Sequence, residues 1–334
     1  MSNSKQKPPV DPGILIVSEA DCKAMVGRDV AFTAVENVFA AMAKGDAYNF
    51  PVIREAIGYA DALYGFKSGF DKAGMSLGVK SGGYWPHNSE KGLINHQSSI
   101  LLFNPDTGKL QALVGGNYLT AIRTAASSAV SIAHLAREGS KVLGMVGAGH
   151  QATFQLRAAL EQRPFEKIVA WNPHPEMLIN LETIANEKGI PFEAVEPEEL
   201  GAQADVIITI TSAFEPLLMK DWIKPGTHIA CMGTDTKGKQ EVDAALVASA
   251  TVFTDEIAQS MTIGEAQHAI ANGLITEQEI TSIGEVINGT HVGRKSDEEI
   301  TLFDGTGVGL QDLAVASVAA KLAASQSNAQ RVFL

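Results

Sequence analysis

The sequence predicts an α/β fold in two parts: an α+β part, followed by a doubly wound parallel sheet of the Rossmann type. Two observations lead to this prediction. Before residue 117, short apolar runs are joined by turn signals, which is typical of antiparallel hairpins. After residue 142, short apolar runs alternate with helical segments, and a glycine-rich turn follows the first run. Such alternation is typical of a parallel sheet with helices on both faces.

Size and charge limit the classes of protein to consider. The chain has 334 residues, enough for two domains, with 45% hydrophobic and 19% charged residues. Its net charge of -12 argues against nucleic acid or an anionic membrane surface as a main partner, because both attract cationic faces. We expect no membrane span, no signal peptide and a cytoplasmic location. The two cysteines, Cys22 and Cys231, build neither a disulfide framework nor a metal site.

The first part begins with two helices. Ser18 is a candidate N-cap for the first, and residues 29–43 have strong helical periodicity. Asn104–Gly108 has the composition of a hairpin turn, because proline presets φ and glycine closes the turn. Strands are expected on both sides of this turn and before it, which predicts a mostly antiparallel sheet. Their expected ranges are 62–66, 75–80, 98–103 and 110–114.

A long helix rich in alanine and serine is expected over residues 120–137, before the second part. The expected parallel strands that follow are 142–146, 168–171, 206–210, 228–232 and 251–254. A final helix over residues 310–324 is expected to cross back and pack on the first part. The predicted domains are therefore 1–120 with 312–334, and 121–311.

Residues 147–152 carry the pattern G-x-G-x-x-A between a predicted strand and a predicted helix. In a dinucleotide-binding turn, Gly147 allows the tight turn and Gly149 lets a pyrophosphate approach bare backbone. The helix that starts here would direct free N–H groups at the phosphates. The motif is weak alone, but the strand before it, the helix after it and the later β/α alternation together predict a dinucleotide site.

The end of the second parallel strand bears on the choice of cofactor. An acidic residue that binds the adenosine ribose is usual there, whereas this chain has Asn172. Asparagine can hydrogen-bond the ribose but does not repel a 2′-phosphate, and no arginine lies nearby in the sequence to bind one. We expect NAD as the cofactor, with NADP not excluded.

Several blocks resemble the ornithine cyclodeaminase/mu-crystallin family, in the family's order and over almost the whole chain. Residues 119–129 resemble its bridging-helix signature, and residues 147–152 match its GxGxQA motif. Residues 284–289 and 297–303 resemble its C-terminal blocks. The resemblance implies a homodimer whose first domain binds substrate and forms the dimer. It also implies hydride chemistry at an imine or iminium next to a carboxylate.

The resemblance also suggests which residues bind the substrate. An imino acid needs cations for its carboxylate and a proton source for its nitrogen. Arg54, Lys80 and Arg123 lie at family-like positions and are expected to bind the carboxylate, with Lys80 also in the catalytic set. Asp235 matches an aspartate that serves as acid/base in the cyclodeaminase branch, where the mu-crystallin branch carries serine. His96 resembles a histidine near the nicotinamide; it is expected among the substrate-binding residues and is the alternative proton source.

The dinucleotide contacts follow from the motif and from the strand ends that resemble the family's. They are expected at Arg123, Gly147, Gly149, His150, Gln151, Asn172, Thr211, Ser212, Met232, Gly233, Lys239 and Thr306. Gly305 stands where the cyclodeaminase branch has serine, which weakens the case for that activity. His87, Asn88 and Lys91 are polar loop residues that could meet a second carboxylate, and they slightly favour a dicarboxylic imino acid.

The combined expectation is an NAD(P)H-dependent oxidoreductase that reduces a small imino acid to an L-amino acid, with iminosuccinate to aspartate preferred. Three enzymatic alternatives stay open: an NAD-using ornithine cyclodeaminase, an alanine-type amino-acid dehydrogenase, and a ketimine reductase like mu-crystallin. A cofactor-linked binding protein is the non-enzymatic alternative. Net consumption of NADH separates a reductase from a cyclodeaminase.

Overall fold

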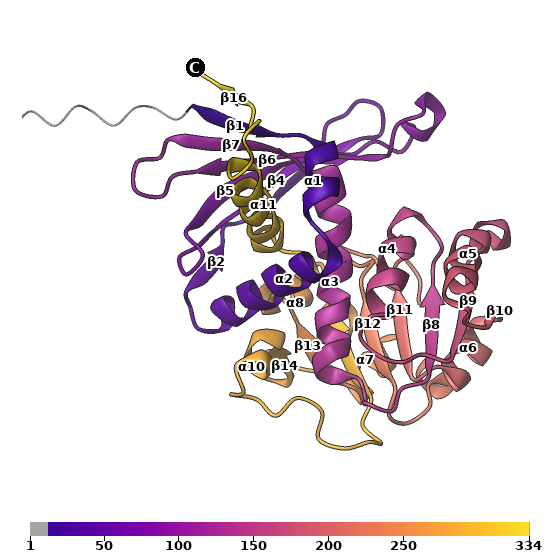
Figure 1. Ribbon diagram of the computed structural model, residues 1–334. Coiled ribbons are helices and arrows are strands. Elements are labelled where there is room, and N and C mark those ends of the chain that lie inside the picture. Colours follow the sequence, from indigo (N-terminus) through magenta and orange to yellow (C-terminus); the bar gives the residue numbers. More distant parts are fainter. Residues whose placement is uncertain (1–12, 334) are drawn as a thin grey trace, which may run out of the picture.

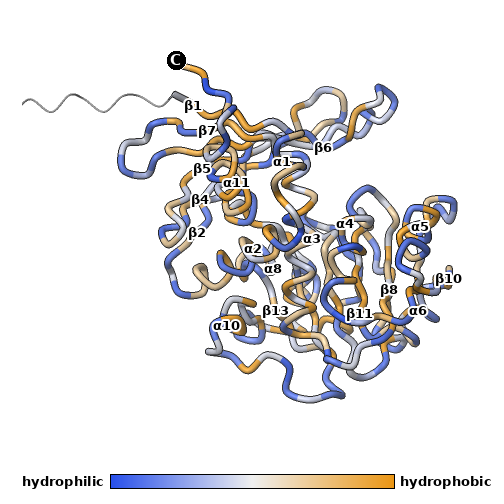
Figure 2. Tube along the Cα trace, in the orientation of Figure 1, coloured by the Kyte–Doolittle hydropathy of each residue, from blue (hydrophilic) through white to orange (hydrophobic). Residues whose placement is uncertain are grey.

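Two eight-stranded sheets, joined by the long helix α3 (Asn117–Leu135), make up the molecule (Figure 1). The structure is a computed structural model and describes residues 13–333. No helix within these residues is long and apolar enough to cross a membrane. Hydrophilic residues concentrate in peripheral loops, such as the long connection that follows α10 (Figure 2).

The first sheet is mostly antiparallel, as predicted, with one parallel pair, β1 with β7. Its strand order is β16-β1-β7-β6-β5-β4-β2, and β3 also pairs with β4. The strands are β1 (Ile14–Val17), β2 (Ala47–Asn49), β3 (Ile53–Ala56), β4 (Leu63–Asp71), β5 (Ser76–Tyr84), β6 (His96–Phe103), β7 (Leu110–Gly115) and β16 (Arg331–Val332).

Local sequence signals account for several boundaries in this part. Ser18 caps α1 (Glu19–Met25) with a capping box, and α2 (Arg28–Ala43) follows as expected. The Asn104 carboxamide accepts from the backbone N–H groups of Asp106 and Thr107, which fixes the predicted turn between β6 and β7. Helix α3 starts three residues earlier than predicted, because the Glu19 carboxylate accepts from the first backbone N–H groups of the helix.

The second sheet is parallel and doubly wound, in the order β10-β9-β8-β11-β12-β15-β13-β14. The first five of these strands reproduce the 3-2-1-4-5 part of the strand order of dinucleotide-binding folds, and β15, the last strand along the chain in this sheet, takes the sixth position. Their bounds are β8 (Val142–Val146), β9 (Lys167–Trp171), β10 (Phe192–Ala194), β11 (Val206–Thr209), β12 (His228–Cys231), β13 (Thr251–Thr254), β14 (Ile280–Ser282) and β15 (Thr301–Asp304). The predicted Rossmann-type sheet is therefore confirmed.

Seven short helices accompany this sheet. They are α4 (His150–Ala159), α5 (Ile179–Lys188), α6 (Pro197–Gln203), α7 (Ala244–Ser249), α8 (Ile257–Thr262), α9 (Gln267–Ala271) and α10 (Ile283–Ile287). Short 3-10 turns lie at Ser89–Lys91, Pro175–Leu178, Lys220–Trp222 and Glu277–Glu279.

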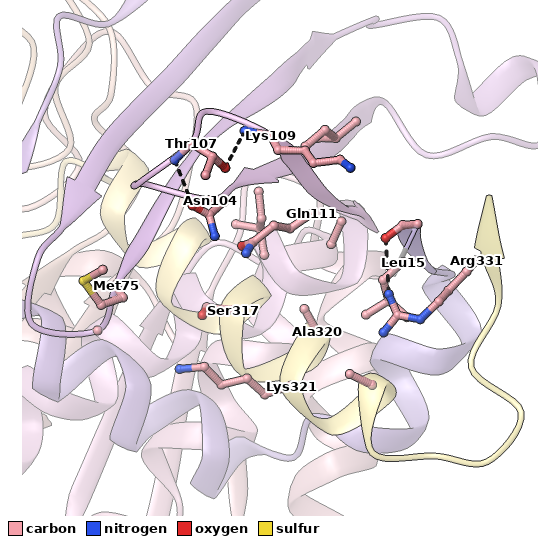
Figure 3. A pocket seen from close by; sticks show the side chains of 16 residues that line it. Leu15, Met75, Asn104, Thr107, Lys109, Gln111, Ser317, Ala320, Lys321 and Arg331 are labelled. Carbon is pink, nitrogen blue, oxygen red and sulfur yellow. Dashed lines mark hydrogen bonds between the residues drawn. The ribbon is translucent and has the colours of Figure 1, made fainter. Parts of the chain in front are cut away.

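The final helix α11 (Gly309–Ala324) returns to the first sheet and packs on β4 and β5, as the sequence predicts (Figure 1). A cavity of about 560 Å³ lies between the far end of α11 and the β6–β7 turn, where Ser317 and Lys321 face Asn104 (Figure 3). It is separate from the larger cavity between the two sheets.

Candidate active site

The larger cavity, about 1070 Å³, lies where the carboxyl ends of β8, β9, β11 and β12 face strands β4 and β5 of the first sheet. Strand order reverses between β8 and β11, and ligands of open α/β sheets bind outside such a switch point. The predicted site residues come together here. Those that line the cavity are Arg54, Lys80, His96, Arg123, Gly147, Gly149, His150, Gln151, Asn172, Thr211, Ser212, Met232, Gly233, Asp235, Lys239 and Thr306.

The glycine-rich turn has the geometry that a dinucleotide requires. Gly147 has φ +107°, and a Cβ there would lie 2.7 Å from the Ile210 carbonyl oxygen. Gly149 is the N-cap of α4, and a Cβ there would meet open space within 4 Å. The backbone at Gly149 is therefore bare toward the cavity, and the N-terminus of α4 can accept an anion. Ala152 is fully buried and lets the helix pack closely on the sheet.

Asn172 has a structural role that the sequence analysis did not anticipate. Its Oδ1 accepts from the Ala148 N–H at 3.0 Å, and its Nδ2 donates to the His174 carbonyl at 2.9 Å. The side chain thus ties the glycine-rich turn to the end of β9. Among the described residues that line the cavity near Asn172, none is lysine or arginine, so this end offers no clamp for a 2′-phosphate.

Cations dominate the opposite end of the cavity. Lys80 and Arg123 share one fully buried carboxylate, Asp312, through contacts of 2.7 Å from Lys80 Nζ and 2.9 Å from Arg123 Nε. Arg123 also donates to the Gln311 carboxamide at 2.8 Å. Burial alone would raise the pKa of Asp312, but Arg123 and Lys80 outweigh burial and lower it to about 2. Asp312 therefore stays ionised and holds both cations at the cavity wall.

The pKa values of Lys80 and His96 are both lowered, but to different extents. Burial is the largest influence on Lys80 and, with Arg123 nearby, lowers its pKa to about 7 despite Asp312. Burial and the neighbouring Lys80 lower the pKa of His96 to about 3, so its imidazole is neutral at ordinary pH. His96 is therefore a poor proton source, which argues against the alternative role expected for it. The ammonium of Lys80 has a pKa suited to proton transfer.

The surroundings of Asp235 change the role that is expected for it. Its carboxylate is bound by Arg54 Nη1 at 2.8 Å and by Lys239 Nζ at 2.8 Å. Burial opposes ionisation, but Lys239 and Arg54 hold the pKa of Asp235 well below its usual range. An aspartate that stays ionised has no proton to donate, so the expected role as an acid is not supported. A fixed negative charge beside an imine can instead stabilise the protonated, cationic form.

Two other expected cofactor-binding residues, Lys239 and Thr306, also form hydrogen bonds within the protein. Lys239 also donates to the Gly233 carbonyl at 3.1 Å, and the Thr306 hydroxyl donates to Asp255 at 2.6 Å. The suggestion that His87, Asn88 and Lys91 meet a second carboxylate is wrong, because none of them lines the cavity. His87 faces Asp61 and Glu90, and Asn88 donates to the Ile94 carbonyl.

Lys67 is the cavity residue that the sequence analysis missed. It lies on β4 directly opposite Lys80 on β5, and both lysines line the cavity. Its Nζ donates to the Gly307 carbonyl at 2.6 Å, and within residues 13–333 it has no carboxylate ion pair. Burial, and then the neighbouring Arg123, lower the pKa of Lys67. A continuation of the period-two pattern past Phe66 would have placed Lys67 on the inner face of the sheet.

Comparison with known proteins agrees with this geometry. The family model for the ornithine cyclodeaminase/mu-crystallin family matches residues 16–326. The chain is 60% identical to the iminosuccinate reductase of Paracoccus denitrificans (strain Pd 1222), over 96% of this chain and 99% of that protein. A crystal structure of the P. denitrificans iminosuccinate reductase in complex with NAD⁺ superposes with a TM-score of 0.93, at 60% identity, covering 96% of this chain and 100% of the other.

An archaeal alanine dehydrogenase, solved as a dimer with bound NAD, superposes with a TM-score of 0.90 at 31% identity, covering 96% and 98% of the two chains. Both structural matches span the two sheets and the cavity between them. The identity, the coverage and the conserved arrangement of sheets agree with the motifs in the sequence. The chain belongs to the ornithine cyclodeaminase/mu-crystallin family.

Proposed function

We propose that the protein is an NADH-dependent imine reductase that converts iminosuccinate to aspartate. One observation carries the choice of substrate: five basic side chains line the cavity, and among residues 13–333 they form ion pairs with two carboxylates, Asp235 in the lining and the buried Asp312 behind it. Asp235 pairs with Arg54 and Lys239, while Asp312 pairs with Lys80 and Arg123. Lys67 is the fifth basic side chain, and it has no carboxylate ion pair within residues 13–333. A dicarboxylate suits this excess better than a monocarboxylate does.

In this proposal each residue has a distinct task. When bound, NADH supplies the hydride for the imine carbon and is itself oxidised to NAD⁺. Lys80 and Arg123 hold the carboxylate next to the imine, and Lys67 with Arg54 holds the distal carboxylate. The charge of Asp235 stabilises the protonated imine nitrogen. The ammonium of Lys80 is a source for the proton that nitrogen gains.

Two features support NADH as the partner dinucleotide. Gly147 and Gly149 leave the backbone open to a pyrophosphate, and the end of the cavity near Asn172 has no lysine or arginine among its described lining residues. The P. denitrificans iminosuccinate reductase was crystallised with NAD⁺. We therefore expect NADH to give a higher kcat/KM than NADPH. We also place the enzyme in the cytoplasm, where NADH is available as a reductant.

The test is an NADH-oxidation assay in which oxaloacetate and ammonia generate the imine in solution. The purified protein should consume NADH only when both are present, and aspartate should accumulate in proportion. Oxaloacetate without ammonia is the control for reduction of the ketone. If NADH is not consumed while ornithine is converted to proline, the protein is a cyclodeaminase and the proposal is overturned.

We further propose that the enzyme is a homodimer formed through the outer face of the first sheet. The face opposite α11 carries a row of apolar side chains in register, Val79, Leu101, Leu113 and Ile16, and Leu113 is 37% exposed. The alanine dehydrogenase relative, 31% identical, was solved as a dimer. A Leu113→Glu variant should sediment as a monomer where the wild type sediments as a dimer. A monomeric wild type would refute the assignment.

The predicted domains, 1–120 with 312–334 and 121–311, belong to the same proposal. Strands β1 to β7 and β16 form the first sheet, on which helix α11 packs, and strands β8 to β15 form the second. We assign the first domain to substrate binding and dimerisation, and the second to the dinucleotide.

A further inference from the structure

Two buried glutamates, Glu241 and Glu265, lie beneath the segment that carries Asp235. Their exposed fractions are 0% and 1%, and neither lines the cavity. They have no cation partner within 4 Å among residues 13–333. Burying two carboxylates without a counter-charge is costly unless hydrogen bonds compensate. The groups that donate these hydrogen bonds therefore show which parts of the chain the two carboxylates hold in place.

The Glu241 carboxylate accepts four hydrogen bonds. One oxygen accepts from the Thr211 N–H at 2.6 Å and from the Thr211 hydroxyl at 2.8 Å. The other accepts from the Thr209 hydroxyl at 2.6 Å and from the Gly233 N–H at 2.9 Å. Thr211 and Gly233 both line the cavity, so one carboxylate joins the segments that follow β11 and β12. A Cβ at Gly233 would overlap the Thr211 carbonyl and this carboxylate, which explains the glycine.

Glu265 holds the same segment from a second side. One of its oxygens accepts from the N–H groups of Glu241 and Val242, at 2.9 and 2.8 Å. The other oxygen shares a hydrogen bond with the Thr234 hydroxyl. The stretch 233–242 is therefore fixed near its start at Gly233 and Thr234, and at its end at Glu241 and Val242. Asp235 and Lys239 lie between these fixed points.

The two carboxylates differ in their charge states. Burial raises the pKa of Glu241, but all four of its hydrogen-bond partners donate to it, which favours the anion with both oxygens free to accept. Burial, and then the neighbouring Glu241, raise the pKa of Glu265 to about 8. A proton on the oxygen of Glu265 that faces Thr234 fits its contacts, because the other oxygen still accepts two N–H groups. Glu265 then resembles a neutral amide in shape and hydrogen bonding.

We propose that Glu241 and Glu265 are positioning residues that set the place of Asp235 against the substrate through the 233–242 segment. The inference rests on the proposed function, because it assumes that Asp235 acts on the imine. A carboxylate at the end of a short loop, bound back to the loop's first N–H, leaves the enclosed aspartate little freedom. Misplacement of a reacting group by about 1 Å can cost roughly 10²-fold in rate.

The test compares Glu241→Gln with Glu265→Gln in the full-length enzyme. Glu241→Gln turns an N–H donor toward other donors, so kcat for imine reduction should fall by about 10- to 100-fold. The Kd for NADH, measured by fluorescence titration, should change little. Glu265→Gln is the matched control and should keep kcat close to wild type, whereas Glu265→Leu should lose it. If Glu265→Gln loses as much as Glu241→Gln, the assignment of the proton to Glu265 is overturned.

A double-mutant cycle distinguishes positioning from general support of the fold. In the Asp235→Asn background, Glu241→Gln should add less than about a two-fold loss, since the residue it positions is already disabled. Equal losses in both backgrounds would refute the inference. If Glu241→Gln does not fold, Thr209→Val removes one buried donor at constant shape. It should increase hydrogen exchange at 233–242 and lower kcat, and no change in either would also refute the inference.

Failure of the proposed function has a different signature. If wild-type protein does not reduce the imine, the proposed function fails before any variant is compared. If wild type is active and Glu241→Gln is equally active, only the positioning inference fails.

Discussion

Replacing Lys67 by methionine should convert a dicarboxylate reductase into one that no longer prefers a second carboxylate. Methionine keeps similar length and fills the same space between β4 and Gly307, but it carries no charge. An ammonium has three donors, and the Gly307 carbonyl takes one of them at 2.6 Å. Two donors remain for a substrate carboxylate in the cavity that this strand faces.

The magnitude follows from the contact that would be lost. A hydrogen bond to a charged group contributes about 1.5–3 kcal/mol, so kcat/KM for iminosuccinate should fall about 10- to 150-fold. Pyruvate with ammonia gives an imine with one carboxylate, and its kcat/KM should change little. The assay is NADH oxidation with each oxo acid at matched ammonia concentrations.

Lys80→Met is the control for this prediction. Lys80 is assigned to the carboxylate that both imines share, so its loss should lower kcat/KM for both substrates alike. If Lys67→Met also lowers both alike, Lys67 does not read the second carboxylate and the choice of iminosuccinate loses its structural basis. Unchanged iminosuccinate turnover in Lys67→Met would lead to the same conclusion.

Three further predictions concern the cofactor, the pH dependence and the charge at Asp235. Gly149→Val should fold normally, because a Cβ there meets open space. It should lose NADH binding in a titration, because the valine side chain fills the pyrophosphate position. Tight NADH binding by a variant with a native circular dichroism spectrum would contradict the placement of the motif. The pKa of Lys80 is lowered to about 7, so its charged form is lost as pH rises through 7 and kcat/KM should fall there. In Lys80→Arg the charge persists, so this fall should move out of the neutral range, and identical pH profiles for the two enzymes would exclude Lys80 as its cause. Asp235→Asn should lower kcat by about 10²–10³-fold with little change in the Kd for NADH, as expected for loss of a fixed charge at the reacting nitrogen; near-full kcat would make Asp235 a loop residue only.

The sequence predicts the two sheets because their long elements obey simple periodicities. Helices α2, α3 and α11 and the strands β5 to β8 lie within a few residues of their predicted ranges. Strands β10 and β14 have three residues each, too few to show a period. Strand β15 is inserted between β12 and β13, out of chain order, and its place depends on pairing with strands distant in the sequence.

The site residues that escaped prediction share a different cause. The apolar run that predicts β4 ends at Phe66, whereas the strand continues to Asp71 through Lys67, which lines the cavity, and Gly69, which lies against Leu310 of α11. Asp312 lies in a mostly apolar helix, 189 residues from Arg123 in the sequence. Its role depends on α11 crossing back beside α3, which local pattern cannot reveal. For Asp235 the position was foreseen, but its charge depends on Arg54 and Lys239 converging in space.

The pairing of Lys80 and Arg123 with Asp312 explains how the cavity can be both cationic and rigid. Two cations side by side without a counter-charge would repel each other, and Lys80 would lose its proton more readily. Asp312 is buried between them and fixes both head groups before a substrate arrives, so little reorganisation is needed on binding. The negative charge of Asp312 also neutralises part of the positive charge that a substrate carboxylate meets at Lys80 and Arg123. Lys67 donates to the Gly307 carbonyl and has no carboxylate ion pair within residues 13–333, so we expect discrimination between one and two carboxylates to depend on this residue.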